Sequence, residues 1–182
     1  MQAELMTDET ILELIRLPGK REDGFKQLVI KYQERLYHAV RNRLTSHEDA
    51  DDVLQNAFLK IFRHIDSFEG RSEIFTWMYR ICINEVSNHQ KKNSRIKIME
   101  INQTEAVAAE PYMDSVDVAD SLEKAVSGLP ERQQMVFRMR YFDELSYKQI
   151  AELLQVTEGA LKASFHHAVR KIEEEFRSKQ IL

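Results

Sequence analysis

The sequence has few of the residues that build loops, crosslinks and metal sites. Among 182 residues there are five glycines, three prolines and one cysteine. A single cysteine excludes an internal disulfide and any CxxC metal site, which favours a reducing compartment. That residue, Cys82, lies between two isoleucines and is typical of a buried small hydrophobic side chain. The scarcity of glycine and proline, without an alternating strand pattern, predicts an all-α fold.

Other absences narrow the class of protein. No apolar run is as long as a membrane span, and the N-terminus lacks a basic segment followed by an apolar one, so we expect a cytoplasmic location. No nucleophile and base, phosphate-binding loop or metal-ligand spacing occurs. We therefore expect a protein that is not an enzyme, with no cofactor, metal or small-molecule substrate. The net charge of −4 argues against tight DNA binding by the protein alone.

The charge changes along the chain. Residues 71–97 are rich in Arg, Lys and amides, whereas residues 100–120 carry six acidic residues and no Lys or Arg. Helical periodicity fades beyond Lys92, and residues 93–118 are polar, acidic and interrupted by Pro111. We therefore predict two small helical domains, 1–93 and 119–182, joined by a flexible acidic linker, 94–118.

Two helical patterns in the first domain have faces that a simple core helix would not need. The pattern after Asp49 has an apolar stripe, but Leu59 lies on its opposite, polar side and indicates a protein partner. The pattern after Ser72 leaves one narrow stripe that combines an indole, amides and cations: Trp77, Arg80, Asn84, Ser87, Asn88 and Lys91. Rings beside cations suit unpaired nucleic acid. The alternative, that Trp77 packs at the core edge and the charges are only solvated, stays open.

The second domain contains a predicted helix-turn-helix. Ser146 and Gln149 form a capping-box pattern for one helix, and Thr157 caps the last helix after a tight turn. The exposed face of the last helix combines small residues with donors: Gly159, Ala160, Ala163, His166, His167 and Arg170, with Lys162 at its flank. Such a face suits a DNA major groove, although plain helical bundles share this outline. Adjacent histidines point about 100° apart on a helix, which argues against a metal site.

Three blocks of the chain stand out in order: DADDVLQNAFLKIF, FEGRSEIFTWMYRICIN and, after the acidic segment, LPERQQMVFRMRYFDELSYKQIAELLQVTEGALKASFHHAVRKIEE. Together they resemble regions 2 and 4 of the extracytoplasmic-function (ECF) group of bacterial sigma factors. The resemblance runs from Phe25 to Glu174, with the blocks in the family's order. It implies a protein that binds core RNA polymerase and directs promoter recognition, DNA opening and transcription initiation. Residues 1–93 would be region 2, and residues 119–182 region 4.

The resemblance assigns residues to three surfaces. Docking on the β′ clamp helices of the polymerase is implied for Asp51, Asp52, Gln55, Asn56 and Leu59. Contact with the minus 10 element is implied for Phe68, Glu69, Arg71, Trp77, Arg80, Asn84, Asn88 and Lys91. Contact with the minus 35 element is implied for Glu158, Gly159, Lys162, Ala163, His166, His167 and Arg170. The polymerase β subunit is a further expected partner.

The last helix departs from the family pattern EGTVKSRLHRAR. Here it reads EGALKASFHHAV, in which Ala160, Ser164 and His167 replace a threonine and two arginines. The loss of two cations weakens phosphate anchoring, so the minus 35 sequence cannot be transferred from relatives.

The resemblance also implies a regulatory partner. Family members are usually held inactive by an anti-sigma factor, often membrane-anchored, which would recruit this protein to the inner membrane face. Two other interpretations stay open. A stand-alone dimeric helix-turn-helix regulator would bind DNA without polymerase. A helical adaptor that binds only protein would have no salt-dependent DNA affinity.

Overall fold

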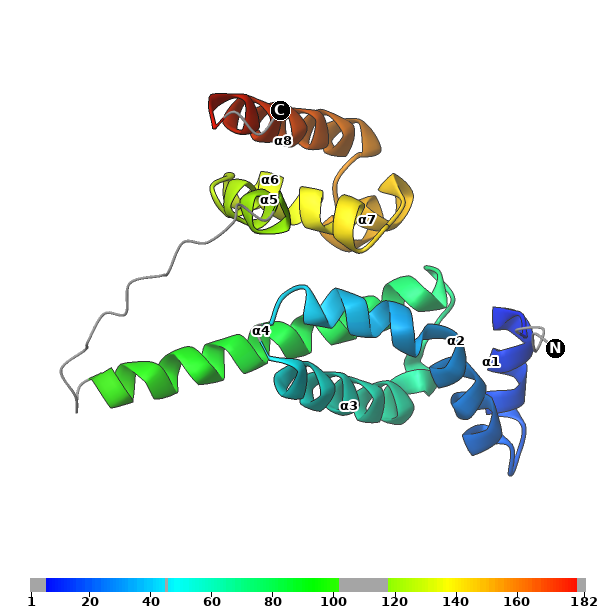
Figure 1. Ribbon diagram of the computed structural model, residues 1–182. Coiled ribbons are helices and arrows are strands. Elements are labelled where there is room, and N and C mark those ends of the chain that lie inside the picture. Colours follow the sequence, from blue (N-terminus) through cyan, green and yellow to red (C-terminus); the bar gives the residue numbers. More distant parts are fainter. Residues whose placement is uncertain (1–5, 45, 102–117, 180–182) are drawn as a thin grey trace. The chain divides into compact units, whose positions relative to one another are not determined.

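The computed structural model describes residues 6–44, 46–101 and 118–179, and side chains within 6–44, 46–94 and 119–179. Every regular element in these ranges is helical, which confirms the all-α prediction (Figure 1). The chain divides into two compact units, Met1–Met99 and Glu100–Leu182. None of the described helices combines the length and the apolar character that a membrane crossing requires.

The first unit contains four α-helices and a short 3-10 turn. The elements are α1 (Asp8–Arg16), α2 (Arg21–Arg41), α3 (His47–His64), η1 (Ile65–Ser67) and α4 (Ile74–Ile101). Local chemistry starts two of them: Thr7 accepts a hydrogen bond from Thr10 N, and Ser46 accepts one from Asp49 N. The core joins α2, α3 and α4 through fully buried side chains, which include Leu28, Leu36, Val40, Ile61, Met78 and Tyr79.

Helix α1 is fixed to α2 by close packing and by one half-buried carboxylate. At Gly24 a Cβ atom would lie 2.7 Å from Ile15 Cγ1 and 2.8 Å from Ile15 N, so only glycine allows this approach. The Asp8 carboxylate accepts hydrogen bonds from the Tyr32 hydroxyl at 2.7 and 2.8 Å and from Lys31 Nζ at 2.8 Å. Burial, and then the hydrogen bond to Asp8, raise the pKa of Tyr32 well above its usual range.

Helix α4 is longer than the sequence indicates. It runs to Ile101 and projects beyond α2 and α3, so residues 94–101 of the predicted linker are helical (Figure 1). The prediction relied on fading amphipathicity, which marks the end of packing rather than the end of a helix. No glycine or proline occurs between Gly70 and Pro111 to stop the helix earlier. Of the remainder of the predicted linker, Val118 begins the next helix and residues 102–117 lie outside the described residues.

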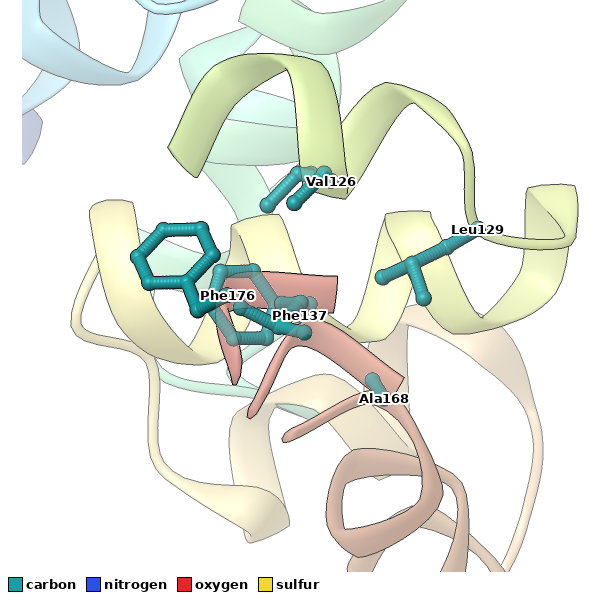
Figure 2. Close-up of a cluster of buried hydrophobic side chains, with 7 residues drawn as sticks. Val126, Leu129, Phe137, Ala168 and Phe176 are labelled. Atoms are coloured by element: carbon teal, nitrogen blue, oxygen red, sulfur yellow. The ribbon is translucent and has the colours of Figure 1, made fainter. Parts of the chain in front are cut away.

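The second unit is built from α5 (Val118–Ser127), α6 (Glu131–Phe137), the π-helical turn η2 (Arg138–Phe142), α7 (Tyr147–Leu154) and α8 (Glu158–Ser178). In Figure 2 the labelled side chains of α5, α6 and α8 converge on one cluster. Its members are Ala125, Val126, Leu129, Phe137, Ala168, Ile172 and Phe176. In η2 the amide of Asp143 donates to Arg138 O at 3.1 Å, a turn wider than that of an α-helix.

The helix-turn-helix follows from the predicted capping residues. Ser146 Oγ accepts from Gln149 N at 3.1 Å, and Gln149 Oε1 accepts from Ser146 N at 2.9 Å, which confirms the capping box. Gln155 ends α7 in the left-handed conformation at φ 58°. Thr157 then accepts from Ala160 N at 3.3 Å and starts α8. These caps fix where α8 begins, and therefore which of its residues face outward.

Candidate protein and nucleic-acid interfaces

An open groove of about 590 Å³ lies between α2 and α3. Its apolar lining is Phe25, Val29, Leu54, Phe58, Leu59 and Phe62, and its polar lining is Gln33, Asp51, Asp52 and Gln55. The Phe25 ring meets Phe62 edge-on at 4.9 Å and Phe58 at 6.3 Å between ring centroids. Leu59 is 50% exposed, so the groove presents apolar surface to solvent beside two carboxylates. Such a groove suits an amphipathic helix with basic residues.

The groove contains most of the predicted polymerase-docking residues. Asp51, Asp52, Gln55 and Leu59 line it, whereas Asn56 is exposed on α3 and does not. The α2 side of the groove was not predicted from the sequence. Phe25 and Val29 fall on an apolar helical stripe, and periodicity cannot tell which end of a stripe a neighbouring helix leaves uncovered.

The loop before α4 and the first turns of α4 form a second surface. Phe68, predicted to contact DNA, is 7% exposed and packs on Trp77, with 5.6 Å between ring centroids. Trp77 is half-buried, so its ring touches the core edge and remains partly accessible. Glu69 and Arg71 are exposed and form an ion pair across Gly70, which has φ +72°. Phe68 therefore supports the indole while the tip of the loop stays in solvent.

The remaining minus 10 candidates lie along the exposed side of α4. Arg80, Asn84, Asn88 and Lys91 are all exposed. Asn88 Nδ2 donates to Glu85 Oε1 at 3.2 Å, and Glu85 also pairs with Lys60 of α3 at 2.6 Å. This ion pair links α4 to α3 and accounts for a carboxylate on the otherwise apolar side of the helix.

The third surface is the outer face of α8. Gly159, Ala163, His166, His167 and Arg170 are exposed, as are Glu158 and Lys162. A Cβ atom at Gly159 would meet nothing within 4 Å, so this face is open. The ring centroids of the adjacent histidines are 6.3 Å apart, and no group of three or more potential metal ligands is found in the described ranges. The donors, small residues and helix N-terminus suit contact with a DNA groove.

One residue of this surface was not predicted from the sequence. Tyr147 begins α7, and its ring centroid lies 5.6 Å from Lys162 Nζ, 5.2 Å from Arg140 Cζ and 6.4 Å from the Phe165 centroid. Lys162 Nζ is also 4.0 Å from Glu158 Oε2. The ring thus holds a cation at the edge of the exposed α8 face. No short-range sequence pattern joins positions so far apart, because only the turn between α7 and α8 brings them together.

Comparison with known proteins agrees with this arrangement. The chain matches the family Sigma-70 region 2 over residues 28–96 and the family Sigma-70, region 4 over residues 119–172. It is 28% identical to the ECF RNA polymerase sigma-E factor of Escherichia coli (strain K12), over 94% of this chain and 95% of that protein. The sigma-E factor of Haemophilus influenzae is 29% identical, over 94% of this chain and 96% of that one.

Two solved structures share the fold. The sigma factor RpoE from Bartonella quintana, in complex with the anti-sigma factor NepR, has a TM-score of 0.63 at 22% identity, covering 84% of this chain and 96% of that chain. CnrH, in complex with the cytosolic domain of CnrY, has a TM-score of 0.66 at 17% identity, covering 94% and 97%. Because both sigma regions match in order and the sigma-E similarity spans nearly the whole chain, this chain belongs to the sigma-70 family, in its extracytoplasmic-function group.

Proposed function

We propose that this ECF sigma factor binds core RNA polymerase through the α2–α3 groove and recognises promoters with α4 and α8. The observation that carries the proposal is that one unit has both an apolar groove suited to a protein and a separate aromatic and cationic stripe suited to DNA. A sigma factor needs both, because it acts on DNA only as part of the polymerase. A stand-alone regulator needs no such groove, and an adaptor needs no such stripe.

In this proposal the loop before α4 and α4 itself recognise the minus 10 element. Trp77, supported by Phe68, offers a stacking surface for an unpaired base, and stacking on an aromatic ring is worth about 1–3 kcal/mol per base. The exposed side chains of Arg80, Asn84 and Lys91 follow along the same helix and would contact the strand. Extruding a base costs a few kcal/mol, which stacking of this size offsets.

In this proposal α8 recognises the minus 35 element. His166, His167 and Arg170 supply hydrogen-bond donors to base edges or phosphates, and Gly159 and Ala163 allow the helix to approach the groove closely. Lys162, held by Tyr147, is suited to a phosphate at the edge of the site. Since the family arginines at two positions are replaced here, the minus 35 affinity of this unit alone is expected to be weak, with a shallower salt dependence than in a relative that keeps those arginines.

We also propose an anti-sigma factor as a partner, which the complexes of RpoE with NepR and of CnrH with CnrY support. In this proposal the protein works in the cytoplasm without catalysing a reaction, and a membrane-anchored anti-sigma factor would recruit it to the inner membrane face.

The direct test is abortive transcription by purified core RNA polymerase on a library of promoter fragments, with and without this protein. We expect initiation from a defined subset of fragments only when the protein is present. Failure to initiate, together with tight DNA binding by the protein alone, would support a dimeric regulator instead.

A further inference from the structure

The first residue of α2 joins the end of α3 to the loop that precedes α4. Arg21 Nη1 donates to Asp66 Oδ2 at 2.6 Å, and Arg21 Nη2 donates to the backbone oxygen of Phe62 at 2.8 Å. Its guanidinium carbon also lies 5.1 Å from the centroid of the Phe62 ring. One half-buried side chain therefore contacts the last turn of α3 and the short turn η1 together.

Both contacts are made at places where a cation is favourable. The last carbonyls of a helix have no partner within the helix and carry its negative partial charge, and Phe62 O belongs to the last turn of α3. Asp66 lies in η1, two residues before Phe68. The planar guanidinium group donates to both oxygens at once, which fixes the direction in which the chain leaves α3.

The loop that follows has few other attachments. Phe68 packs on Trp77, while Glu69 and Arg71 pair with each other at the exposed tip, where a Cβ at Gly70 would meet nothing within 4 Å. On its α4 side the loop is thus held by Phe68. On its α3 side Arg21 adds to two local hydrogen bonds, from Phe68 N to Ile65 O at 3.1 Å and from Ser67 Oγ to His64 O at 2.6 Å. Releasing one side would enlarge the set of conformations from which the loop must be ordered on DNA, and that ordering costs conformational entropy.

We propose that Arg21 is a positioning residue for the loop Phe68–Arg71, and so controls promoter opening without touching DNA. The proposal rests on the proposed function, which puts this loop at the minus 10 element. Arg21 precedes the segment that matches Sigma-70 region 2, which begins at residue 28. Because the Arg21 and Asp66 side chains are 36% and 63% exposed, their ion pair alone contributes little, and the hydrogen bond to Phe62 O carries most of the effect.

The experiment measures opening of a linear promoter by permanganate reactivity of unpaired thymines, using reconstituted holoenzyme. Arg21→Ala should lower the extent of opening about tenfold, the factor expected for loss of one hydrogen bond to a charged donor. Arg21→Lys cannot donate to both oxygens in the same geometry, so its extent of promoter opening should lie between those of Arg21→Ala and the wild type. Asp66→Asn keeps an acceptor oxygen, so its extent of promoter opening should fall by less than threefold, as expected for a weak exposed ion pair.

The matched control is Lys20→Ala. Lys20 is the preceding residue and also forms an exposed ion pair, with Asp23 at 3.1 Å, but that pair does not contact the loop. Lys20→Ala should open the promoter as well as the wild type. Affinity of each variant for core polymerase, measured without DNA, should change less than twofold.

Several outcomes would overturn the proposal. One is promoter opening by Arg21→Ala within twofold of the wild type. Another is a loss of opening in Lys20→Ala equal to that in Arg21→Ala. The third is a loss of opening in Arg21→Ala that weaker polymerase binding accounts for in full. If Arg21→Ala fails to fold, Arg21→Met replaces it, because methionine keeps an apolar stem but removes both donors; opening by Arg21→Met within twofold of the wild type would overturn the proposal. Failure of the wild-type protein itself to open any promoter would instead count against the proposed function.

Discussion

Truncation of Leu59 to alanine should weaken binding to core RNA polymerase while leaving the fold intact. Leu59 lines the α2–α3 groove and is 50% exposed. Full burial of a leucine side chain is worth about 1.5–3 kcal/mol, so covering the exposed half contributes about 1 kcal/mol, or about fivefold in Kd. Stability should change by less than about 0.5 kcal/mol, because the lost atoms are mostly in solvent. Polymerase binding is measured by fluorescence anisotropy of labelled protein without DNA.

Ile30 provides a matched control for Leu59. It is 48% exposed on α2 but does not line the groove, so Ile30→Ala removes similar apolar area from a neighbouring surface. We expect this variant to bind polymerase as the wild type does. The groove assignment would be refuted if Leu59→Ala bound within twofold of the wild type, or if Ile30→Ala lost as much affinity as Leu59→Ala.

Three further predictions concern other parts of the molecule. Tyr147→Leu should release Lys162 and weaken minus 35 DNA binding severalfold with a shallower salt dependence, whereas Tyr147→Phe, which keeps the ring, should bind normally in the same titration. Gly24→Ala should destabilise the first unit by about 1–3 kcal/mol in urea unfolding through overpacking against α1, while Gly159→Ala, whose Cβ meets open space, should not destabilise the second. Burial raises the pKa of Cys82 to about 12, whereas a thiol in the unfolded chain has a pKa of about 8.5, so the folded state binds this proton more tightly. The free energy of unfolding should therefore fall as the pH rises above about 8.5, by up to about 1.4 kcal/mol per pH unit. In Cys82→Ala this fall should be less steep.

The parts of the fold that depend on neighbouring residues could be predicted from the sequence. Ser146 and Thr157 cap their helices as predicted, because a cap needs only a side-chain oxygen three residues before a free amide. The exposed faces of α4 and α8 follow from helical geometry in the same way.

The parts of the structure that depend on how the helices pack could not be predicted from the sequence. The α2 wall of the groove carries ordinary apolar residues, Phe25 and Val29, whose incomplete coverage is decided by α3. Phe68 looks like an exposed loop aromatic in the sequence, but Trp77 provides a ring for it to pack on. Arg21 and Tyr147 act on residues far along the chain, and only tertiary structure brings those partners within reach.

The π-helical turn at Arg138–Phe142 has a consequence for comparing relatives of this chain. Such a turn contains one residue more than an α-turn, so it behaves as an insertion absorbed within a helix. Deleting one residue there would let the segment close as a regular α-helix without breaking α6 or removing the capping box of α7. A one-residue gap aligned to this segment would therefore mark a change in helical phase between α6 and the helix-turn-helix, and not a lost loop.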